Sequence, residues 1–342
     1  MIEFMRELMP ICRSITGDGV RQTLQRIRNV VPLEVHEVPS GTQVFDWQVP
    51  KEWNIREAFL IGPDGKKIVD FADHNLHVMS YSIPIDVELD LHDLQDHLHS
   101  IPDQPDLIPY RTSYYNENWA FCLPHALRES LPKGRYKARI DSTLANGALS
   151  YGELFIPGQS DEEFLVYSHV CHPSIANDNL SGIAVTTWWA KHLLEEGGNK
   201  LSYRFVWGPG TIGSITWLAR NPEKMARIRH GLVAVLLGRP GEFHYKCSRS
   251  GDNAIDRIVT QVIKGTDSGS QIRPFDPYGY DERQFCSPGI NLPVGRISRV
   301  PNGEYREYHT SADSLDLISD GALLEALGVV IKVGQAVEGN RT

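Results

Sequence analysis

Residues from 148 onward alternate short apolar runs with helical patterns, and this alternation constrains the fold more than any other feature. Residues 163–170, EFLVYSHV, form a nearly continuous apolar run, which is typical of a strand buried on both faces. Helical spacing follows in 180–197, and further strand-like runs stand at 203–208 and 231–237. Buried strands that alternate with helices predict an α/β fold with a mostly parallel central sheet flanked by helices.

A second region differs in character. Residues 37–144 contain short alternating runs separated by Pro and Gly, such as FLIGPDGKKIVDF, and this pattern predicts a small β-rich module. The preceding residues 1–36 show the apolar spacing of a pair of helices. We therefore expect 1–36 and 145–342 to build one α/β domain, with 37–144 inserted into it as a small β-rich domain.

Composition excludes several classes of protein. The 342 residues carry a net charge of -9, which argues against a nucleic-acid partner because phosphate binding needs a basic face. No run of roughly 18 apolar residues is present, so no membrane span is expected. The five cysteines are scattered without paired spacing, as in a reduced cytoplasmic protein. A homo-oligomer is compatible with the sequence.

A polar motif stands where the apolar run 163–170 ends. The stretch SHVCHPSIANDNLSG places His169, His172 and Asp178 at the carboxyl end of a predicted strand, which is where functional groups gather in such sheets. Imidazole and carboxylate are ligands that zinc prefers. An isolated Asp before a helix is more often an N-cap. The two interpretations of Asp178 are compatible, because a helix N-terminus also favours an anion.

Two further polar clusters stand downstream. In 303–315, GEYREYHTSADSL, His309 is accompanied by Tyr308 and by Asp313, which we expect to orient the imidazole. A lone histidine would more often be a satisfied surface or core residue. The other cluster, in 280–295, contains Asp281, Glu282 and Arg283, for which a solvated turn is the simplest alternative.

These motifs resemble the zinc aminopeptidase family, which includes bacterial leucyl aminopeptidases, glutamate carboxypeptidases and glutaminyl cyclase. The resemblance rests on a strand followed by His, on D-N-x-S-G opening a helix, and on a late Y-H-T-x-x-D. Phrases such as VPKEWNIR, DFADHNLHV and SHVCHPSIANDNLSG are similar to a bacterial aminopeptidase-like branch with a small domain inserted near the N-terminus. The resemblance covers almost the whole chain.

The resemblance implies a ligand set for zinc. The family's metal-bridging aspartate falls on Asp178, and its late histidine ligand falls on His309. The first histidine ligand is either His172, which carries the Cys-His-Pro signature of the branch, or His169, which directly ends the strand. We favour His172.

Two positions depart from the family pattern. Gly210 stands where a glutamate is expected, and Arg239 stands where a further acidic ligand is expected. Because a cation repels a second metal ion, the sequence predicts one zinc, held by His172, Asp178 and His309. Three protein ligands leave a fourth position open to water, as a catalytic zinc requires.

The resemblance implies a zinc-dependent hydrolase of aminopeptidase type that acts on an amide or peptide-like bond of a small molecule. Glu282 and Asp281 are the candidate proton acceptors, with Glu282 favoured. Arg283 or Arg239 would hold a substrate carboxylate, and Tyr308 would contact the substrate. The alternatives are a protein that keeps the fold but only binds a ligand or partner, and another zinc-dependent reaction on a biosynthetic intermediate.

Overall fold

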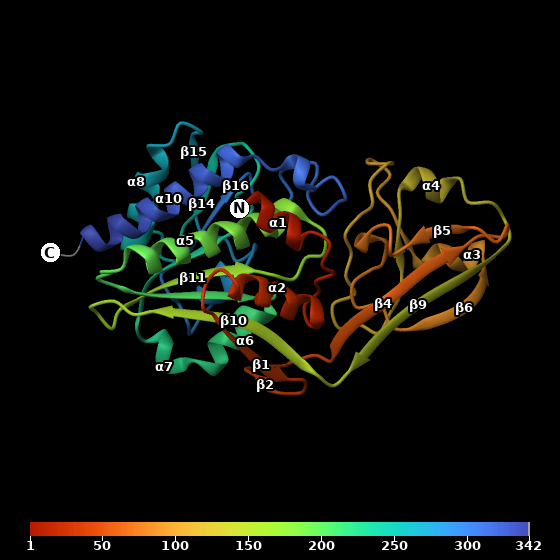
Figure 1. Cartoon of the computed structure of the whole chain (residues 1–342), viewed down its shortest axis with the longest axis horizontal. Coiled ribbons are helices and arrows are strands. Elements are labelled where there is room, and N and C mark those ends of the chain that lie inside the picture. The colour runs from red at the N-terminus through yellow and green to blue at the C-terminus, as the bar shows by residue number, and fades with distance from the viewer. Residues whose placement is uncertain (341–342) are drawn as a thin grey trace.

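The computed structural model describes residues 1–340, and its strands form two main sheets that lie apart (Figure 1). The larger sheet has eight strands. In spatial order they are β1 (Glu34–Pro39), β10 (Ala148–Ile156), β12 (Ser202–Gly208), β11 (Glu163–His169), β13 (Ile228–Ala234), β16 (Val294–Arg299), β14 (Phe243–Lys246) and β15 (Ser270–Arg273). No helix of the described chain is long and apolar enough to cross a membrane.

The centre of the large sheet is parallel. Strand β11 pairs in parallel with both β12 and β13, and β13 pairs in parallel with β16. Antiparallel pairs join β1 to β10, β10 to β12, and β14 to β16. Every residue of β11 is buried, which explains its continuous apolar run. The predicted α/β fold is confirmed, with antiparallel strands toward the edges of the sheet.

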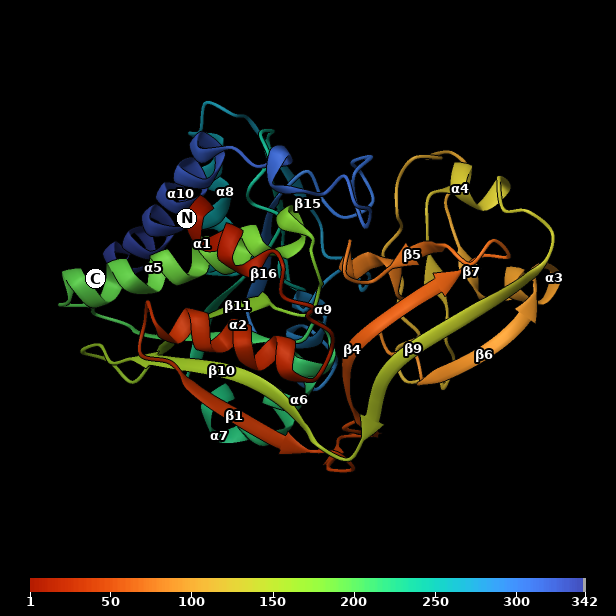
Figure 2. The same ribbon diagram turned by 45° about the vertical axis from the view of Figure 1, so that its right-hand side comes forward.

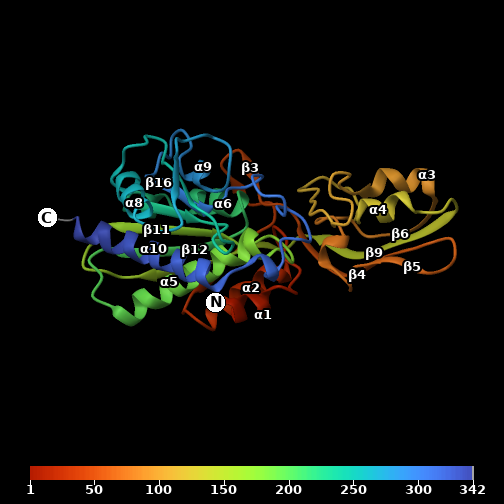
Figure 3. The same ribbon diagram turned by 90° about the horizontal axis from the view of Figure 1, so that it is seen from above.

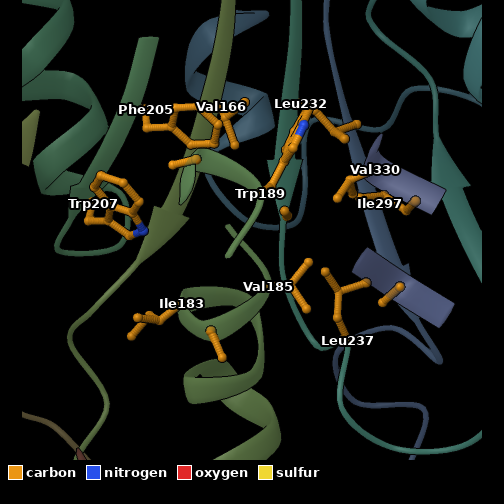
Figure 4. Close-up of a cluster of buried hydrophobic side chains, with 14 of the residues drawn as sticks. Val166, Ile183, Val185, Trp189, Phe205, Trp207, Leu232, Leu237, Ile297 and Val330 are labelled. Atoms are coloured by element: carbon orange, nitrogen blue, oxygen red, sulfur yellow. The ribbon is translucent and has the colours of Figure 1, made fainter. Parts of the chain in front are cut away.

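Helices cover both faces of this sheet. One face packs against α1 (Ile2–Leu8), α2 (Asp18–Arg28), α5 (Gly182–Glu196), α8 (Ala254–Lys264) and α10 (Asp320–Gly339). The other packs against α6 (Ile212–Arg220) and α9 (Glu282–Phe285). Alternation along β11 sends Phe164 and Val166 into the first core and Leu165 and Tyr167 into the second. Trp189 of α5 lies in the first core, among Phe205, Leu232 and Val330 (Figure 4).

The second sheet lies beyond one end of the large one, on the side away from the C-terminus (Figures 2 and 3). Its antiparallel strands follow the order β5 (Lys67–Asp70), β4 (Glu52–Ile61), β9 (Arg135–Ala145) and β6 (Ile85–Asp90). These strands share a separate apolar cluster that includes Leu60, Val69 and Ile140. The division of the chain into domains, with limits at 37 and 144, stays a prediction, and β1 spans the first of these limits.

The remaining elements are short. They are β2 (Gln43–Val44), β3 (Trp47–Gln48), β7 (Leu98–His99), β8 (Phe121–Cys122), α3 (Leu91–Leu94), α4 (His125–Glu129), α7 (Pro222–Met225), η1 (Asn75–His77), η2 (Gln95–His97), η3 (Ala176–Ser181) and η4 (Leu315–Leu317).

Glu52 joins the two sheets. Its carboxylate accepts hydrogen bonds from Arg21 of α2 at 2.9 Å, from the backbone N–H of Ala148 in β10 at 2.9 Å, and from Asn54 at 3.0 Å. The hydrogen bond from Arg21, outweighing partial burial, lowers the pKa of Glu52 to about 2. Glu52, the first residue of β4, therefore links the small sheet to α2 and to strand β10 of the large sheet.

We predict that Glu52→Gln lowers the free energy of unfolding by about 1–2 kcal/mol at pH 7, because the glutamine loses the charge that Arg21 and the N–H group bind. A carboxyl with a lowered folded-state pKa contributes stability above its unfolded pKa, near 4.5, and loses that contribution as the pH falls toward 2. The difference between wild type and variant should therefore shrink between pH 5 and pH 2 in urea titrations.

The exposed Glu88, whose nearest cationic partner is Arg135 at 3.9 Å, gives a matched control in Glu88→Gln. An equal loss of stability in both variants would contradict the role of Glu52.

Candidate functional site

Asp178 is the centre of a cluster of three imidazoles. It lies fully buried in η3, between β11 and α5. His169 Nε2 lies 2.8 Å from Asp178 Oδ1, and His309 Nε2 lies 2.9 Å from Oδ2. His172 Nε2 lies 3.8 Å from Oδ2. The structure thus brings the three candidate histidine ligands together around the Asp178 carboxylate.

The charge states in this cluster suit a metal ion. Burial alone would raise the pKa of Asp178, but the electrostatic interaction with His172 and the hydrogen bonds from His169 and His309 outweigh it and hold the pKa well below its usual value. Burial lowers the pKa of His172 to about 3. The carboxylate is therefore ionised and His172 is neutral, which are the forms that bind metals.

The donor atoms also fit a metal by position. One donor atom from each of His169, His172 and Asp178 lies within 4.8 Å of the others, so these residues could hold a metal ion. The buried His169 Nδ1 has no hydrogen-bond partner within residues 1–340. Imidazole nitrogen and carboxylate oxygen form a typical zinc ligand set.

The asparagines on either side of Asp178 fix its loop to the strands. Asn179 donates to Ser168 Oγ at 2.9 Å and to the His169 carbonyl at 3.1 Å. Asn177 Oδ1 accepts the N–H group of Gly238, beyond the end of β13, at 3.0 Å. The Asn-Asp-Asn sequence therefore joins the carboxyl ends of two parallel strands beneath the cluster.

Asp313 holds the same loop from another side. It accepts the N–H groups of Asn177 at 2.5 Å and Asp178 at 3.2 Å, and the hydroxyl of Tyr305 at 3.1 Å. The prediction that Asp313 orients the imidazole of His309 is wrong, because these hydrogen bonds take its carboxylate to the Asp178 backbone. Asp313 is a positioning residue for the loop.

Residues 108–110 form hydrogen bonds with the backbone around His309. The N–H of Tyr110 donates to the His309 carbonyl at 2.8 Å, and the N–H of Ser311 donates to the Ile108 carbonyl at 2.9 Å. The Tyr110 ring lies 4.9 Å from the His172 ring and 5.0 Å from the His309 ring. This contact was absent from the sequence predictions, since nothing local in 108–110 indicates it.

The cluster opens into a cleft of about 380 Å³. Tyrosines form much of its wall, and the sequence predictions missed Tyr280, whose hydroxyl donates to Asp178 Oδ2 at 3.2 Å and whose ring stacks on His169. Residues lining the cleft include His169, His172, His309, Tyr110, Tyr114, Tyr278, Tyr280, Tyr308, Gly210, Asp281 and Arg283.

Gly210 lies beside the imidazole cluster. A Cβ at this position would lie 3.5 Å from Cys171 Sγ and 3.7 Å from His169 Cβ, which are ordinary contacts. A Cβ would therefore fit at Gly210, so the absence of an acid here is not imposed by crowding at that atom.

Asp281 is the acid that does reach the cleft. Its Oδ1 accepts the Thr211 N–H at 2.7 Å and the Ser214 hydroxyl at 2.6 Å. Its buried Oδ2 has no hydrogen-bond partner in the described part of the chain. Burial raises the pKa of Asp281 to about 6. One oxygen of this carboxyl is thus anchored and the other is free.

Glu282 and Arg239 lie elsewhere. Glu282 is fully buried, and its Oε1 lies 2.9 Å from Lys246 Nζ and 3.6 Å from Arg296. The Arg239 guanidinium lies over the Tyr305 ring at 5.1 Å. Within the described chain neither residue lines the cleft that holds the imidazoles.

Arg283 and Tyr308 do line that cleft. The Nε of Arg283 is buried and has no hydrogen-bond partner among the residues described. The Tyr308 ring stacks on His309 at 3.9 Å, and its hydroxyl lies 3.3 Å from that of Tyr280. A cation and a hydroxyl therefore face the same hollow as the cluster.

Comparison with known proteins gives this site a context. A family model described as "Domain of unknown function (DUF4910)" matches residues 2–340. The chain belongs to the DUF4910 family. A relative from Clostridium acetobutylicum, named "Putative polysaccharide biosynthesis protein with aminopeptidase-like domain", is 49% identical over 338 residues, which cover 99% of this chain and 77% of the relative.

Solved structures extend the comparison of this DUF4910 protein. A crystal structure of a "putative peptidase" from Clostridium acetobutylicum has a TM-score of 0.97 at 48% identity, and the match covers 100% of this chain and 80% of that one. A zinc aminopeptidase from Bacillus subtilis has a TM-score of 0.70 at 15% identity, with 98% and 94% covered. A glutaminyl cyclase from an Acidobacteriales bacterium has a TM-score of 0.58 at 12% identity, with 99% and 93% covered.

The two low-identity matches concern the fold alone. That fold is the one that the resemblance to zinc aminopeptidases and glutaminyl cyclase implied. The relative that is 49% identical is likewise named for an aminopeptidase-like domain.

We predict that Asp313→Ala lowers the affinity for zinc by about 10–100-fold, because residues that position metal ligands typically contribute that much. Zinc affinity would be measured by competition with a chromophoric chelator. Asp316→Ala, an exposed aspartate three residues away, is the control. Unchanged zinc affinity in folded Asp313→Ala would contradict the positioning role.

Proposed function

We propose that this DUF4910 protein is a zinc-dependent hydrolase of an amide or peptide-like bond in a small molecule. The observation that carries the proposal is the buried, ionised Asp178 surrounded by three imidazoles that line a cleft. The aminopeptidase-like name of a relative at 49% identity supports the same reaction class. The scattered free cysteines, four of them buried, favour a cytoplasmic location.

Three residues would hold the metal in this proposal. Asp178 Oδ2 lies 3.8 Å from His172 Nε2 and 2.9 Å from His309 Nε2, so one oxygen is near both imidazoles. His169 engages the other oxygen and would orient the carboxylate. A zinc ion in such a site acidifies a bound water and polarises a carbonyl group. We propose one zinc per chain, because neither Gly210 nor Arg239 offers an acidic ligand.

Asp281 is the better-placed proton acceptor of the two adjacent acids. It lines the cleft, and its buried Oδ2 has no hydrogen-bond partner in the described chain, whereas the Glu282 carboxylate lies against Lys246. A raised pKa of about 6 also suits a general base near neutral pH. We therefore propose Asp281 as the base.

The substrate is expected to carry an anionic or strongly polar group near the reacting bond. Arg283, whose Nε is unpaired in the described chain, would bind a carboxylate, and Tyr308 would contact the substrate beside His309. The relative named for polysaccharide biosynthesis suggests which compounds to test first. These are amide-bearing saccharide intermediates, together with aminoacyl and acylamino compounds.

We predict about one zinc per chain by elemental analysis after dialysis, and hydrolysis of at least one compound of that panel. Hydrolysis should stop when a chelator removes the zinc and return when zinc is added back. Two tightly held zinc ions per chain would show that other side chains replace the missing acids. Full zinc occupancy without turnover would favour a ligand-binding protein, which the missing glutamate at position 210 would explain.

We predict that Asp281→Asn reduces turnover by about a hundred- to ten-thousand-fold while zinc content stays unchanged, as expected when a general base is removed. Because the base must be ionised, wild-type kcat/KM should fall as the pH drops through about 6. The exposed Asp267 provides the control variant Asp267→Asn. Near-normal turnover in Asp281→Asn, with loss in folded Glu282→Gln, would transfer the role to Glu282.

A further inference from the structure

A second hollow lies next to the cleft that holds the imidazole cluster. Its volume is about 370 Å³, and three cations, Lys246, Arg273 and Arg296, lie in its wall. Tyr278 and Asn302 line both hollows, so the two are neighbouring compartments. Nothing in the proposed hydrolysis step uses this second compartment.

The three cations form a row across three adjacent strands. In the register of the sheet, Lys246 of β14 stands opposite Arg273 of β15 and opposite Arg296 of β16. Residues directly opposite one another in a sheet project from the same face. Like charges in such positions repel each other unless an anion lies among them. We call Lys246, Arg273 and Arg296 the cationic row.

The acids around the cationic row leave its buried part positively charged. Lys246 and Arg296 have side chains only 5% and 4% exposed, and they share one carboxylate, that of Glu282. Arg273 is paired with Glu304, whose side chain is 46% exposed, and the exposed Asp276 also lines the hollow. Two buried cations therefore face one buried carboxylate.

Arg296 also has a donor group without a hydrogen-bond partner in the described chain. Its Nη1 donates to Asn302 Oδ1 at 3.1 Å, but its buried Nε has no partner within the described residues. A buried guanidinium donor without a partner is costly, and a bound anion would satisfy it.

The cationic row lies close to the imidazole cluster. The Arg296 guanidinium lies over the Tyr280 ring, 5.6 Å from its centroid. The same ring stacks on the His169 imidazole, with 4.9 Å between the ring centroids. Gly279 lines the first cleft, and a Cβ there would lie 3.1 Å from both Arg296 Nη1 and Lys246 Nζ. Glu282 Oε1 would lie nearer still, so the backbone of Gly279 packs directly against the row and its shared carboxylate.

We infer that the second hollow binds a phosphate or carboxylate group of the substrate, so that the substrate is an anionic small molecule that spans both compartments. This inference rests on the proposed function for its description of the reacting bond, but the anion site itself does not require a metal. Guanidinium groups bind both kinds of anion through hydrogen bonds, and Arg296 keeps a donor without a partner in the described chain. Arg273, which is bound to Glu304, adds positive charge beside it.

Binding of inorganic phosphate and of acetate tests this inference without any turnover. Each anion would be titrated into wild type and into the Asp178→Asn variant. The variant is included because zinc itself binds phosphate, and Asp178→Asn removes the carboxylate proposed to hold the zinc. We expect phosphate to bind both proteins with similar affinity, and to bind about 10–100-fold more weakly to Arg296→Gln and Arg273→Gln. Acetate binding more tightly than phosphate would identify a carboxylate site, and the reverse order a phosphate site.

Arg139→Gln is the matched control. Arg139 also lies on a strand, pairs with the acids Glu57 and Asp86, and has a side chain 37% exposed against 32% for Arg273. Because Arg296 is buried, thermal melting would verify that its variant is folded, and the more exposed Arg273 gives an independent variant.

The inference would be overturned if both Arg296→Gln and Arg273→Gln left phosphate binding unchanged. It would also be overturned if phosphate binding disappeared in Asp178→Asn, or if neither anion bound to wild type. The two proposals can fail separately. Lost hydrolysis with intact phosphate binding would contradict the proposed function alone. Intact hydrolysis with no anion binding at the row would contradict this inference alone.

Discussion

A buried, ionised carboxylate is the constraint around which the functional half of this protein is arranged. Removing a carboxylate from water is costly unless charge partners and hydrogen bonds replace the lost solvent. Asp178 receives that compensation from imidazoles contributed by the end of β11, by the loop after it, and by a loop 131 residues downstream. The first two imidazoles come from neighbouring residues of one segment, and the fold brings the third to them from a distant part of the chain.

The large sheet and a loop from the region around the small sheet both contribute to the cluster. Asn177 and Asn179 fix the Asp178 loop to the large sheet, and Asp313 fixes it to the loop that carries His309. Tyr110, from the region around the small sheet, then bonds to the His309 backbone. The region 37–144 therefore contributes to the site, since part of the cleft wall comes from it.

Much of the fold and part of the site could be predicted from the local sequence. The continuous apolar run of β11 and the motif that follows it predicted the strand, the helix and the group of His172 and Asp178, because those features depend on neighbouring residues. Other features depend on distant contacts. Asp281 and Glu282 are adjacent and look equivalent in sequence, yet one reaches the cleft while the other lies against Lys246. Tyr110 could not be placed beside His309 without the tertiary structure.

The most direct test of this account is anomalous diffraction at the zinc absorption edge from a crystal of the zinc-loaded protein. The account predicts one anomalous peak per chain, within about 2.0–2.2 Å of Asp178 Oδ2 and of the Nε2 atoms of His172 and His309. The fourth position should hold water. A peak bound by all three histidines and Asp178, with no open position, or no peak at this carboxylate, would contradict it.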